Sequence, residues 1–197
     1  MYLWGVNLGN KVFWFDVETT GLDPIKQDII QLAFLIEIDG DIIEGQNLLM
    51  QPFDYNAINQ EALDVHGRTI KEIKTYPDPR IVYTELIAIL EKYVDRYNPL
   101  DKFHPAGYNS RFDLDFLRHF FIKNEDVYFG SWFNYKAIDP LSLLHLLDGI
   151  GCVSLDNYRL ETVCKHFNIP LKAHDALSDI HATRDLANFI CSKYIKK

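Results

Sequence analysis

The apolar and polar positions in the first quarter of the chain predict three β-strands. Val12 to Val17 is almost continuously apolar, which is typical of a strand that is buried on both faces. Ile29 to Ile38 and Ile42 to Met50 are two further strand-like runs. Asp39-Gly40 joins these two runs, and this dipeptide suits the positive φ angles of a tight hairpin turn. The chain is therefore expected to begin with a three-stranded antiparallel sheet.

Helical spacing becomes the main signal further along the chain. From Ile81 to Tyr97, apolar residues recur every three or four positions until Asn98-Pro99. Ile58 to Tyr76 is more polar and predicts short helices and loops. The remaining pattern predicts helices over Phe112 to Ile122, Leu141 to Leu147, Leu160 to Ile169 and Asp175 to Tyr194, and short strands within Phe103 to Tyr108 and Val127 to Ile138. Strands followed by alternating helices and short strands indicate one α/β domain with a mixed sheet, covering residues 1–197.

Composition narrows the functional classes. A chain of 197 residues with 48% apolar residues can fill one core. The formal charge of −8 argues against binding nucleic acid through a broad basic face, although it leaves room for binding through a metal site. Three cysteines without a CxxC pair indicate neither a disulfide framework nor a zinc cluster, and favour the cytoplasm. No run reaches membrane-spanning length, so no membrane association is expected.

Two carboxylates stand one residue apart at the end of the first predicted strand. Asp16 and Glu18 precede a turn at Gly21. Residues i and i+2 of a strand point to the same side, so these two side chains should project together. Two like charges held this close need a counter-charge, and a hard divalent cation such as Mg²⁺ prefers oxygen ligands. The pair therefore predicts half of a metal site.

Two later segments offer the remaining acidic residues. Asp113 and Asp115 lie near the start of a predicted helix, and His174 precedes another helix that contains Asp179. Taken alone, each acid is explained by the ordinary preference of Asp for the first turn of a helix. Taken together, the three segments could converge on one point.

The three segments resemble the motifs of the DnaQ-like, or DEDDh, 3′-to-5′ exonucleases of the ribonuclease H-like superfamily. The resemblance is carried by Asp-x-Glu-Thr-Thr-Gly-Leu at 16 to 22, Asn-x-x-Phe-Asp-x-x-Phe-Leu at 109 to 117 and His-x-Ala-x-x-Asp at 174 to 179, in the family's order. It implies a ribonuclease H-like mixed sheet of five strands, three antiparallel and then parallel ones, flanked by helices. It also implies a hydrolase that removes nucleoside 5′-monophosphates from a nucleic-acid 3′ end.

Carried over residue by residue, the resemblance assigns the chemistry to five positions. The family's four metal-ligating acids fall on Asp16, Glu18, Asp113 and Asp179, and its general base falls on His174. Two Mg²⁺ or Mn²⁺ ions are the implied cofactors, and a near-neutral imidazole suits removal of a proton from water. The resemblance also suggests substrate contacts from Thr19, Thr20, Leu22, His66, Asn109 and Phe112, although Leu22 and Phe112 could equally be core residues.

The polymer and the partners are less well defined by the sequence. The motifs favour DNA, with single-stranded DNA 3′ ends as the expected partner, and an RNA-directed exonuclease is the alternative. A stand-alone enzyme, a proofreading subunit that binds a DNA polymerase, and a non-catalytic binding module of the same fold are further hypotheses. An aspartate-nucleophile phosphatase is disfavoured because such enzymes need a second Asp where Glu18 stands. The aromatic cluster of Tyr128, Phe129, Trp132, Phe133 and Tyr135 is expected to close a core or sheet edge more readily than to stack on bases.

Overall fold

A four-stranded mixed sheet forms the centre of the molecule. The computed structural model describes residues 11–172 and 176–195. Strands β1 (Lys11–Thr19), β2 (Ile29–Ile38) and β3 (Asp41–Leu49) form the predicted antiparallel meander, and β4 (His104–Ala106) pairs with β1 in parallel. The strand order is β3-β2-β1-β4. The β2–β3 turn has positive φ angles at Asp39 and Gly40, as the dipeptide predicts.

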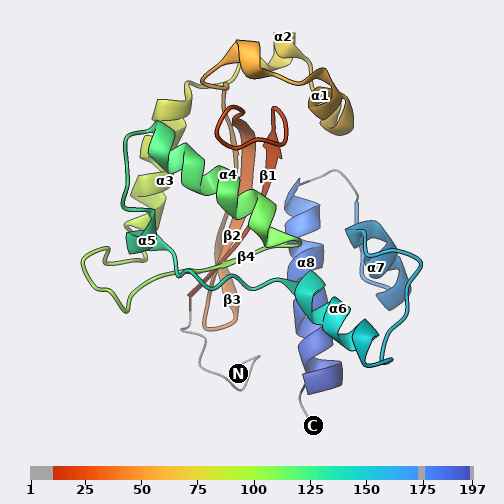
Figure 1. The fold of residues 1–197 in the computed structure, drawn as a ribbon. Coiled ribbons are helices and arrows are strands. Elements are labelled where there is room, and N and C mark those ends of the chain that lie inside the picture. Colours follow the sequence, from red (N-terminus) through yellow and green to blue (C-terminus); the bar gives the residue numbers. More distant parts are fainter. Residues whose placement is uncertain (1–10, 173–175, 196–197) are drawn as a thin grey trace.

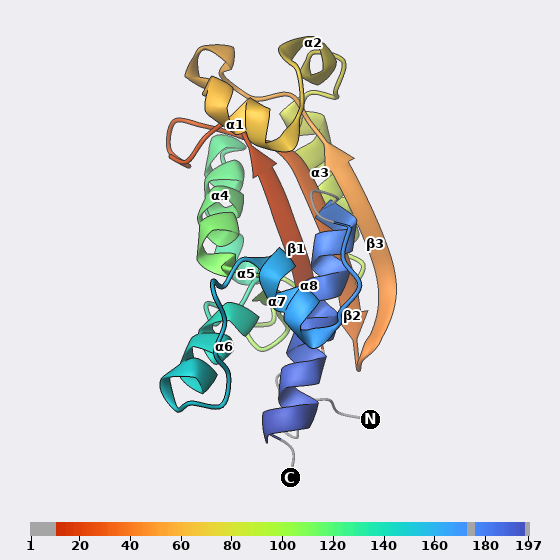
Figure 2. The same cartoon turned by 90° about the vertical axis from the view of Figure 1, so that its right-hand side faces the viewer.

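Helices cover both faces of this sheet, as Figures 1 and 2 show. Helices α3 (Pro79–Leu90), α4 (Ser110–Lys123) and α5 (Phe129–Trp132) lie on one face. Helix α8 (Ala176–Ile190) lies on the other face and continues as a π-helical turn, Cys191–Ile195. Helices α6 (Pro140–Gly149) and α7 (Leu160–Phe167) pack against the outer side of α8. This three-layer arrangement confirms the predicted α/β class.

The two faces of β1 belong to different cores. Phe13, Phe15 and Val17 pack into the large core beneath α3 and α4. Val12 and Trp14 pack with residues of α8 on the opposite face. Because side chains alternate along a strand, Asp16 and Glu18 continue the row of Val12 and Trp14 on the α8 side.

The prediction of five strands is wrong, because the segment after α5 does not form a regular strand. This segment pairs with residues 103–106, which include β4, at two isolated parallel bridges, Phe103 with Phe133 and Ala106 with Ile138. Between the bridges one chain advances three residues and the other advances five, so the second chain must bulge outward and cannot maintain a ladder. The residues from 129 to 132, predicted within the same short strand, form α5 instead.

The predicted helix from Ile81 to Tyr97 ends early, at Leu90. Asp78 caps its start by accepting a hydrogen bond from the amide of Arg80 at 2.8 Å. Beyond the helix the Asp95 carboxylate accepts from the amide of Tyr97 at 3.0 Å, a local bond that competes with helical pairing. Tyr97 is consequently 88% exposed.

Short helices complete the end of the sheet where β1 terminates. A 3₁₀ turn (Tyr55–Ala57), α1 (Gln60–His66) and α2 (Ile70–Ile73) lie beyond the C-terminal end of β1 (Figure 1), in the region predicted to hold short helices and loops. Within residues 11–172 and 176–195, no helix has both the length and the apolar character needed to cross a membrane. In Figure 1, α1 lies beyond the upper end of β1, and the starts of α4 and α8 lie lower, at the level of the body of the strand.

Candidate active site

Strand β1 presents two carboxylates at the end of the sheet. Asp16 lies opposite Ala33 of β2, and Glu18 lies opposite Gln31. Both are partly exposed, unlike the apolar residues that alternate with them. The regular pairing with β2 shifts just after Glu18, so the strand turns away immediately beyond the carboxylate pair.

Helix α4 brings a third carboxylate to the same place from the opposite face of the sheet. Asp113 lies in the first turn of α4 and is only 5% exposed. Its carboxylate accepts a hydrogen bond from the backbone amide of Val17, the residue between Asp16 and Glu18, at 3.1 Å. This contact fixes Asp113 directly against the strand that carries the other two acids.

Helix α8 supplies the fourth carboxylate. Asp179 lies in the first turn of α8, which packs on the Trp14 side of β1. Asp16 and Asp179 both line a pocket of about 190 Å³ between β1, β4, α7 and α8. The volume suits water molecules or ions better than a nucleotide, because sites for small organic ligands usually measure about 300 Å³ or more.

Electrostatic interactions connect the four carboxylates. Burial raises the pKa of Asp16 well above its ordinary value, and the charges of Asp113, Glu18 and Asp179 raise it further. Burial also raises the pKa of Asp113 to about 7, although the hydrogen bond from Val17 opposes the shift. Without a counter-charge, the site therefore retains protons that isolated carboxyl groups would release near pH 4.

This donor set fits divalent metal ions. Four carboxylates offer hard oxygen ligands, and a bound cation would relieve the mutual repulsion that raises the pKa of Asp16 and Asp113. Among residues 11–172 and 176–195, no three His, Cys, Asp or Glu side chains lie close enough together to hold a metal ion in the arrangement seen here, so the four acids would have to move closer to bind one.

The raised pKa of Asp113 predicts a pH dependence of stability in the metal-free protein. Its pKa is about 7 in the folded state against 3.8 for an ordinary aspartate, so between these values the folded protein binds more protons than the unfolded chain. Raising the pH from 4 to 7 should therefore lower the free energy of unfolding, by at most about 4 kcal/mol from this group. Urea titrations of the wild type and Asp113→Asn in EDTA, at half-unit pH steps, test this. The difference between the two proteins should grow in favour of the variant as the pH rises, and a constant difference would contradict the assignment.

The predicted substrate contacts after the first motif have different environments. Thr20 is fully buried, and its hydroxyl accepts a hydrogen bond from the amide of Asp28 at 2.9 Å. This bond stabilises the loop between β1 and β2. Thr19 is also buried and donates to the carbonyl of Gly21 at 2.6 Å. Leu22, by contrast, is 80% exposed at the tip of this loop, which excludes the alternative that it is a core leucine.

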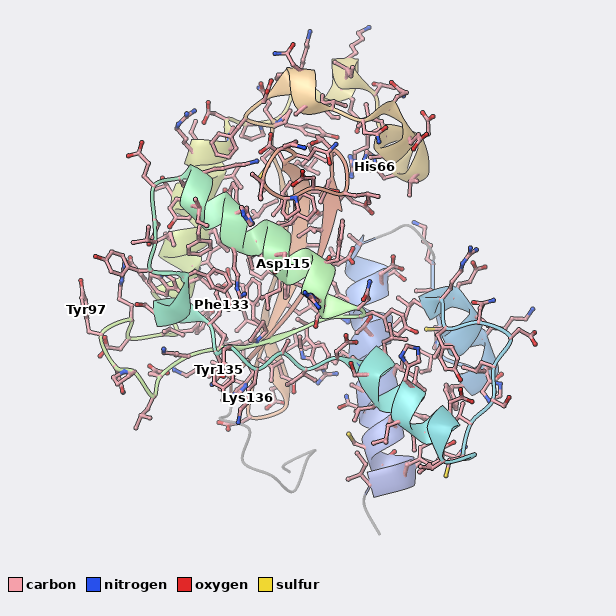
Figure 3. All side chains as sticks on the ribbon, viewed as in Figure 1. His66, Tyr97, Asp115, Phe133, Tyr135 and Lys136 are labelled. Carbon is pink, nitrogen blue, oxygen red and sulfur yellow. The ribbon has the colours of Figure 1, made fainter. Side chains whose placement is uncertain are left out.

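His66 lies close to the same loop from α1, at the upper right of Figure 3. Its Nε2 lies 3.3 Å from the carbonyl oxygen of Thr19. Burial lowers the pKa of His66, so the imidazole is neutral near pH 7. The carbonyl can only accept, which places the proton on Nε2 and leaves Nδ1 as an acceptor; Nδ1 is buried and has no hydrogen-bond partner among the described residues.

The remaining predicted residues flank Asp113 or lie beyond the described chain. Asn109 is exposed and adopts a left-handed conformation, with φ 57°, just before α4. Phe112 is half-buried and its ring packs on Phe116 with centroids 4.9 Å apart, so it belongs partly to the core. The predicted general base, His174, lies outside the described residues, and its role stays a prediction.

One functional neighbour, Asp139, was not assigned a role from the sequence. Its carboxylate accepts hydrogen bonds from the amides of Asn109 and Ser110 at the start of α4, and from the amide of Leu141 at the start of α6. One side chain therefore caps two helices, one of which carries Asp113. The only signal in the sequence is the Asp-Pro pair at 139 and 140, which is typical of a helix start.

Gly107 lets the backbone pack closely against β1 beside the carboxylates. A Cβ atom at this position would lie 2.9 Å from the carbonyl oxygen of Phe15, the residue before Asp16. The absence of a side chain thus lets the turn between β4 and α4 pack directly against β1 beside the carboxylates.

Known proteins resemble this chain in sequence. A family model described as exonuclease, RNase_T, matches residues 13–187. The chain is 31% identical over 180 residues to a PolC-type DNA polymerase III of Halalkalibacterium halodurans, an alignment that covers 91% of this chain and 11% of that protein. It is 30% identical over 145 residues to an oligoribonuclease of Pseudoalteromonas atlantica, covering 70% of this chain and 75% of the relative. The chain thus spans about one tenth of the length of the PolC-type relatives that it matches.

Solved structures share the fold. Exonuclease I of Methylocaldum szegediense superimposes with a TM-score of 0.77 at 24% identity, covering 94% of this chain and 41% of that chain. E. coli Exonuclease I in complex with a dT13 oligonucleotide superimposes with a TM-score of 0.76 at 20% identity, covering 92% and 41% of the two chains. The predicted ribonuclease H-like fold is confirmed by these neighbours. With the family model covering most of the domain, this chain belongs to the RNase_T exonuclease family.

Proposed function

We propose that this domain is a metal-dependent 3′-to-5′ exonuclease that releases nucleoside 5′-monophosphates, with single-stranded DNA as the favoured substrate. The observation that carries the proposal is the convergence of Asp16, Glu18, Asp113 and Asp179, whose charges act on one another at the end of β1. Family membership supports hydrolysis of a nucleic acid at its end. The four carboxylates would hold two Mg²⁺ or Mn²⁺ ions, which supply Lewis-acid chemistry at the scissile phosphate when bound.

The protein's own groups have separate tasks in this proposal. His174 would accept a proton from the attacking water as the water oxygen bonds to phosphorus and the bond to the 3′ oxygen breaks. Leu22 is exposed at the tip of the loop after β1, and the partly exposed His66 lies beside this loop. Both side chains would contact the terminal nucleotide. The products are a nucleoside 5′-monophosphate and a polymer shortened by one residue with a new 3′ hydroxyl.

DNA is favoured as substrate by two of the comparisons. The relatives include PolC-type DNA polymerases, and the structural neighbours include complexes with DNA oligonucleotides. The relation to PolC also supports a DNA polymerase as partner, in a proofreading role. These supports concern only a small part of the PolC-type proteins, because this chain matches about one tenth of their length.

Short RNA is the second candidate substrate. The oligoribonuclease from Pseudoalteromonas atlantica is matched over 75% of its own length, a far larger share than in the PolC-type proteins. The two candidates make different demands on the terminal nucleotide, because only RNA carries a 2′ hydroxyl that can donate and accept hydrogen bonds.

A substrate panel tests both candidates. Four 5′-labelled substrates are incubated with Mg²⁺: single-stranded DNA, duplex DNA with a mismatched 3′ end, long RNA, and RNA of two to five nucleotides. The proposal expects a ladder that shortens from the 3′ end, fastest for single-stranded DNA and absent in EDTA. Preference for the shortest RNA would select the second candidate instead. A wild type that shortens none of them would overturn both and favour a non-catalytic binding module.

The polymerase partnership needs its own measurement. Adding the exonuclease domain to a polymerase extending a mismatched primer should increase correct extension only if the mismatch is first removed. The same yield is then measured when the exonuclease acts first and is removed before the polymerase is added. A higher yield with both proteins present at once indicates that they act as a complex, and equal yields would count against a proofreading complex.

A further inference from the structure

A buried ion pair connects β2 to α8 on the face of the sheet that carries Asp16, four residues along β2 from the partner of Asp16. Glu37, near the end of β2, is only 4% exposed and is paired with Arg184 of α8. The same carboxylate oxygen accepts a hydrogen bond from the indole nitrogen of Trp14 at 3.0 Å. Arg184 also donates to the carbonyl oxygen of Gly40, in the β2–β3 turn, at 2.9 Å. We refer to Trp14, Glu37 and Arg184 as the polar clamp.

The polar clamp connects the two elements that carry Asp16 and Asp179, namely β1 and α8. Trp14 precedes Asp16 by two residues on β1 and shares its face of the sheet. Arg184 follows Asp179 by five residues on α8, about 7.5 Å along the helix axis. The clamp therefore joins β1 to α8 one and a half helical turns from the acids.

Half of the buried apolar residues between α8 and the sheet have small side chains. Several residues between α8 and the sheet are alanines, Ala33, Ala106, Ala176 and Ala187, among a few larger apolar side chains. Small apolar side chains allow close approach but interlock weakly, so a helix can shift along such a surface at small cost. Hydrogen bonds to a buried charge are directional, so they form fully in only one position of α8 on the sheet. Fixing the relative position of packed elements is the best-supported role of buried polar groups.

We propose that Glu37 and Arg184 are positioning residues that set the distance between Asp16 and Asp179 by fixing α8 on the sheet. The proposal rests on the proposed function, since the consequence of the position is a correctly spaced set of acids for metal ions. The clamp touches no substrate. Its effect should therefore appear in metal affinity and in kcat, while KM for the nucleic acid stays unchanged.

The decisive experiment separates position from stability. Arg184→Met alone leaves the Glu37 carboxylate buried without its ion-pair partner, so a loss of activity there could reflect unfolding. The double variant Glu37→Met/Arg184→Met removes both charges and keeps the volume, which should bring Tm back to within a few degrees of the wild type. Lys11→Met is the matched control, because Lys11 lies at the same end of β1 as the partner of Glu37 but forms its ion pair, with Asp101, on the other face of the sheet.

The expected result is that the double variant regains stability without regaining function. Its kcat should stay at least about tenfold below the wild type, and the Mg²⁺ concentration for half-maximal rate should rise on the order of tenfold. Lys11→Met should lose stability while keeping both values. If the double variant recovers kcat and the Mg²⁺ midpoint along with Tm, the clamp is only structural and the proposal is wrong.

A readout without catalysis keeps this test independent of the proposed function. Bound Mn²⁺ stabilises the folded state, so titration with Mn²⁺ should raise Tm in the wild type and in Lys11→Met. The rise should be shifted to about tenfold higher Mn²⁺ in the double variant. An unshifted rise would overturn the positioning role even if no nuclease substrate were found. An inactive wild type with this Mn²⁺ pattern would instead overturn only the proposed activity.

Discussion

Replacing Asp16 by asparagine is expected to lower kcat by about a thousandfold while making the metal-free protein more stable. The activity is lost because an amide cannot supply the charge of a carboxylate in the shared site. The stability rises because Asp16 is held beside Glu18, Asp113 and Asp179, whose charges raise its pKa together with burial. A neutral side chain of the same shape removes that repulsion, and we expect Tm in EDTA to rise by about 3–6 °C.

Two measurements on one preparation check this expectation. Product ladders from 5′-labelled single-stranded DNA give the rate, and thermal unfolding in EDTA gives Tm. Asp115→Asn is the matched control, since Asp115 lies two residues after Asp113 on α4 (Figure 3) and is not among the charges that raise the pKa of Asp16. It should keep both the rate and Tm. Equal loss of activity in Asp115→Asn would mean that the second-motif ligand is misassigned, and a lower Tm in Asp16→Asn would contradict the electrostatic account.

Asp139→Ala should cause a large loss of stability although the residue lies outside the apolar core. The variant removes the acceptor for three backbone amides, those of Asn109, Ser110 and Leu141, at the starts of two helices. An N-cap substitution costs about 0.5–2 kcal/mol per helix, so we expect a loss of about 3 kcal/mol and a fall in Tm of about 8 °C. Because α4 carries Asp113, the rate should also fall, by about tenfold.

Asp78→Ala is the control for this prediction. Asp78 caps a single helix, α3, by accepting from the amide of Arg80, and it lies on an element without site residues. It should lose about 1 kcal/mol and keep the full rate. Urea unfolding and steady-state kinetics of both variants measure the two effects. Equal losses in both variants would show that the second helix and the site do not depend on Asp139.

The parts of this structure that local patterns determine were predictable from the sequence. Alternation along β1 placed Asp16 and Glu18 on one face, and the structure has Trp14 and Phe15 in the two different cores that this alternation requires. The β2–β3 turn follows from the backbone freedom of Asp39-Gly40. The helix predicted from Leu160 to Ile169 begins at Leu160 as its amphipathic pattern indicates, and it ends two residues early, at Phe167, because Asn168 adopts a left-handed conformation.

Features that depend on distant partners were not predictable. The segment after α5 has a strand-like composition, and only its mismatch in length against β4 shows that it cannot form a ladder. Of the aromatic cluster, Trp132 and Phe133 are buried as expected, whereas Tyr135 is exposed and projects from the lower part of Figure 3. Asp139 and Arg184 are ordinary charged residues in the sequence, and their roles exist only through partners about 30 or more residues away.

The topology has a consequence for incomplete chains of this domain. Asp16 lies on β1, the first described strand, and Asp179 lies on α8, the last described helix, so the two meet only after the intervening residues have folded. A fragment released by proteolysis or interrupted synthesis before residue 176 would contain the nucleic-acid-facing loop and three of the acids without the fourth. On the proposed function such fragments should not cleave nucleic acid, because the set of acids is complete only when both ends of the described chain are present.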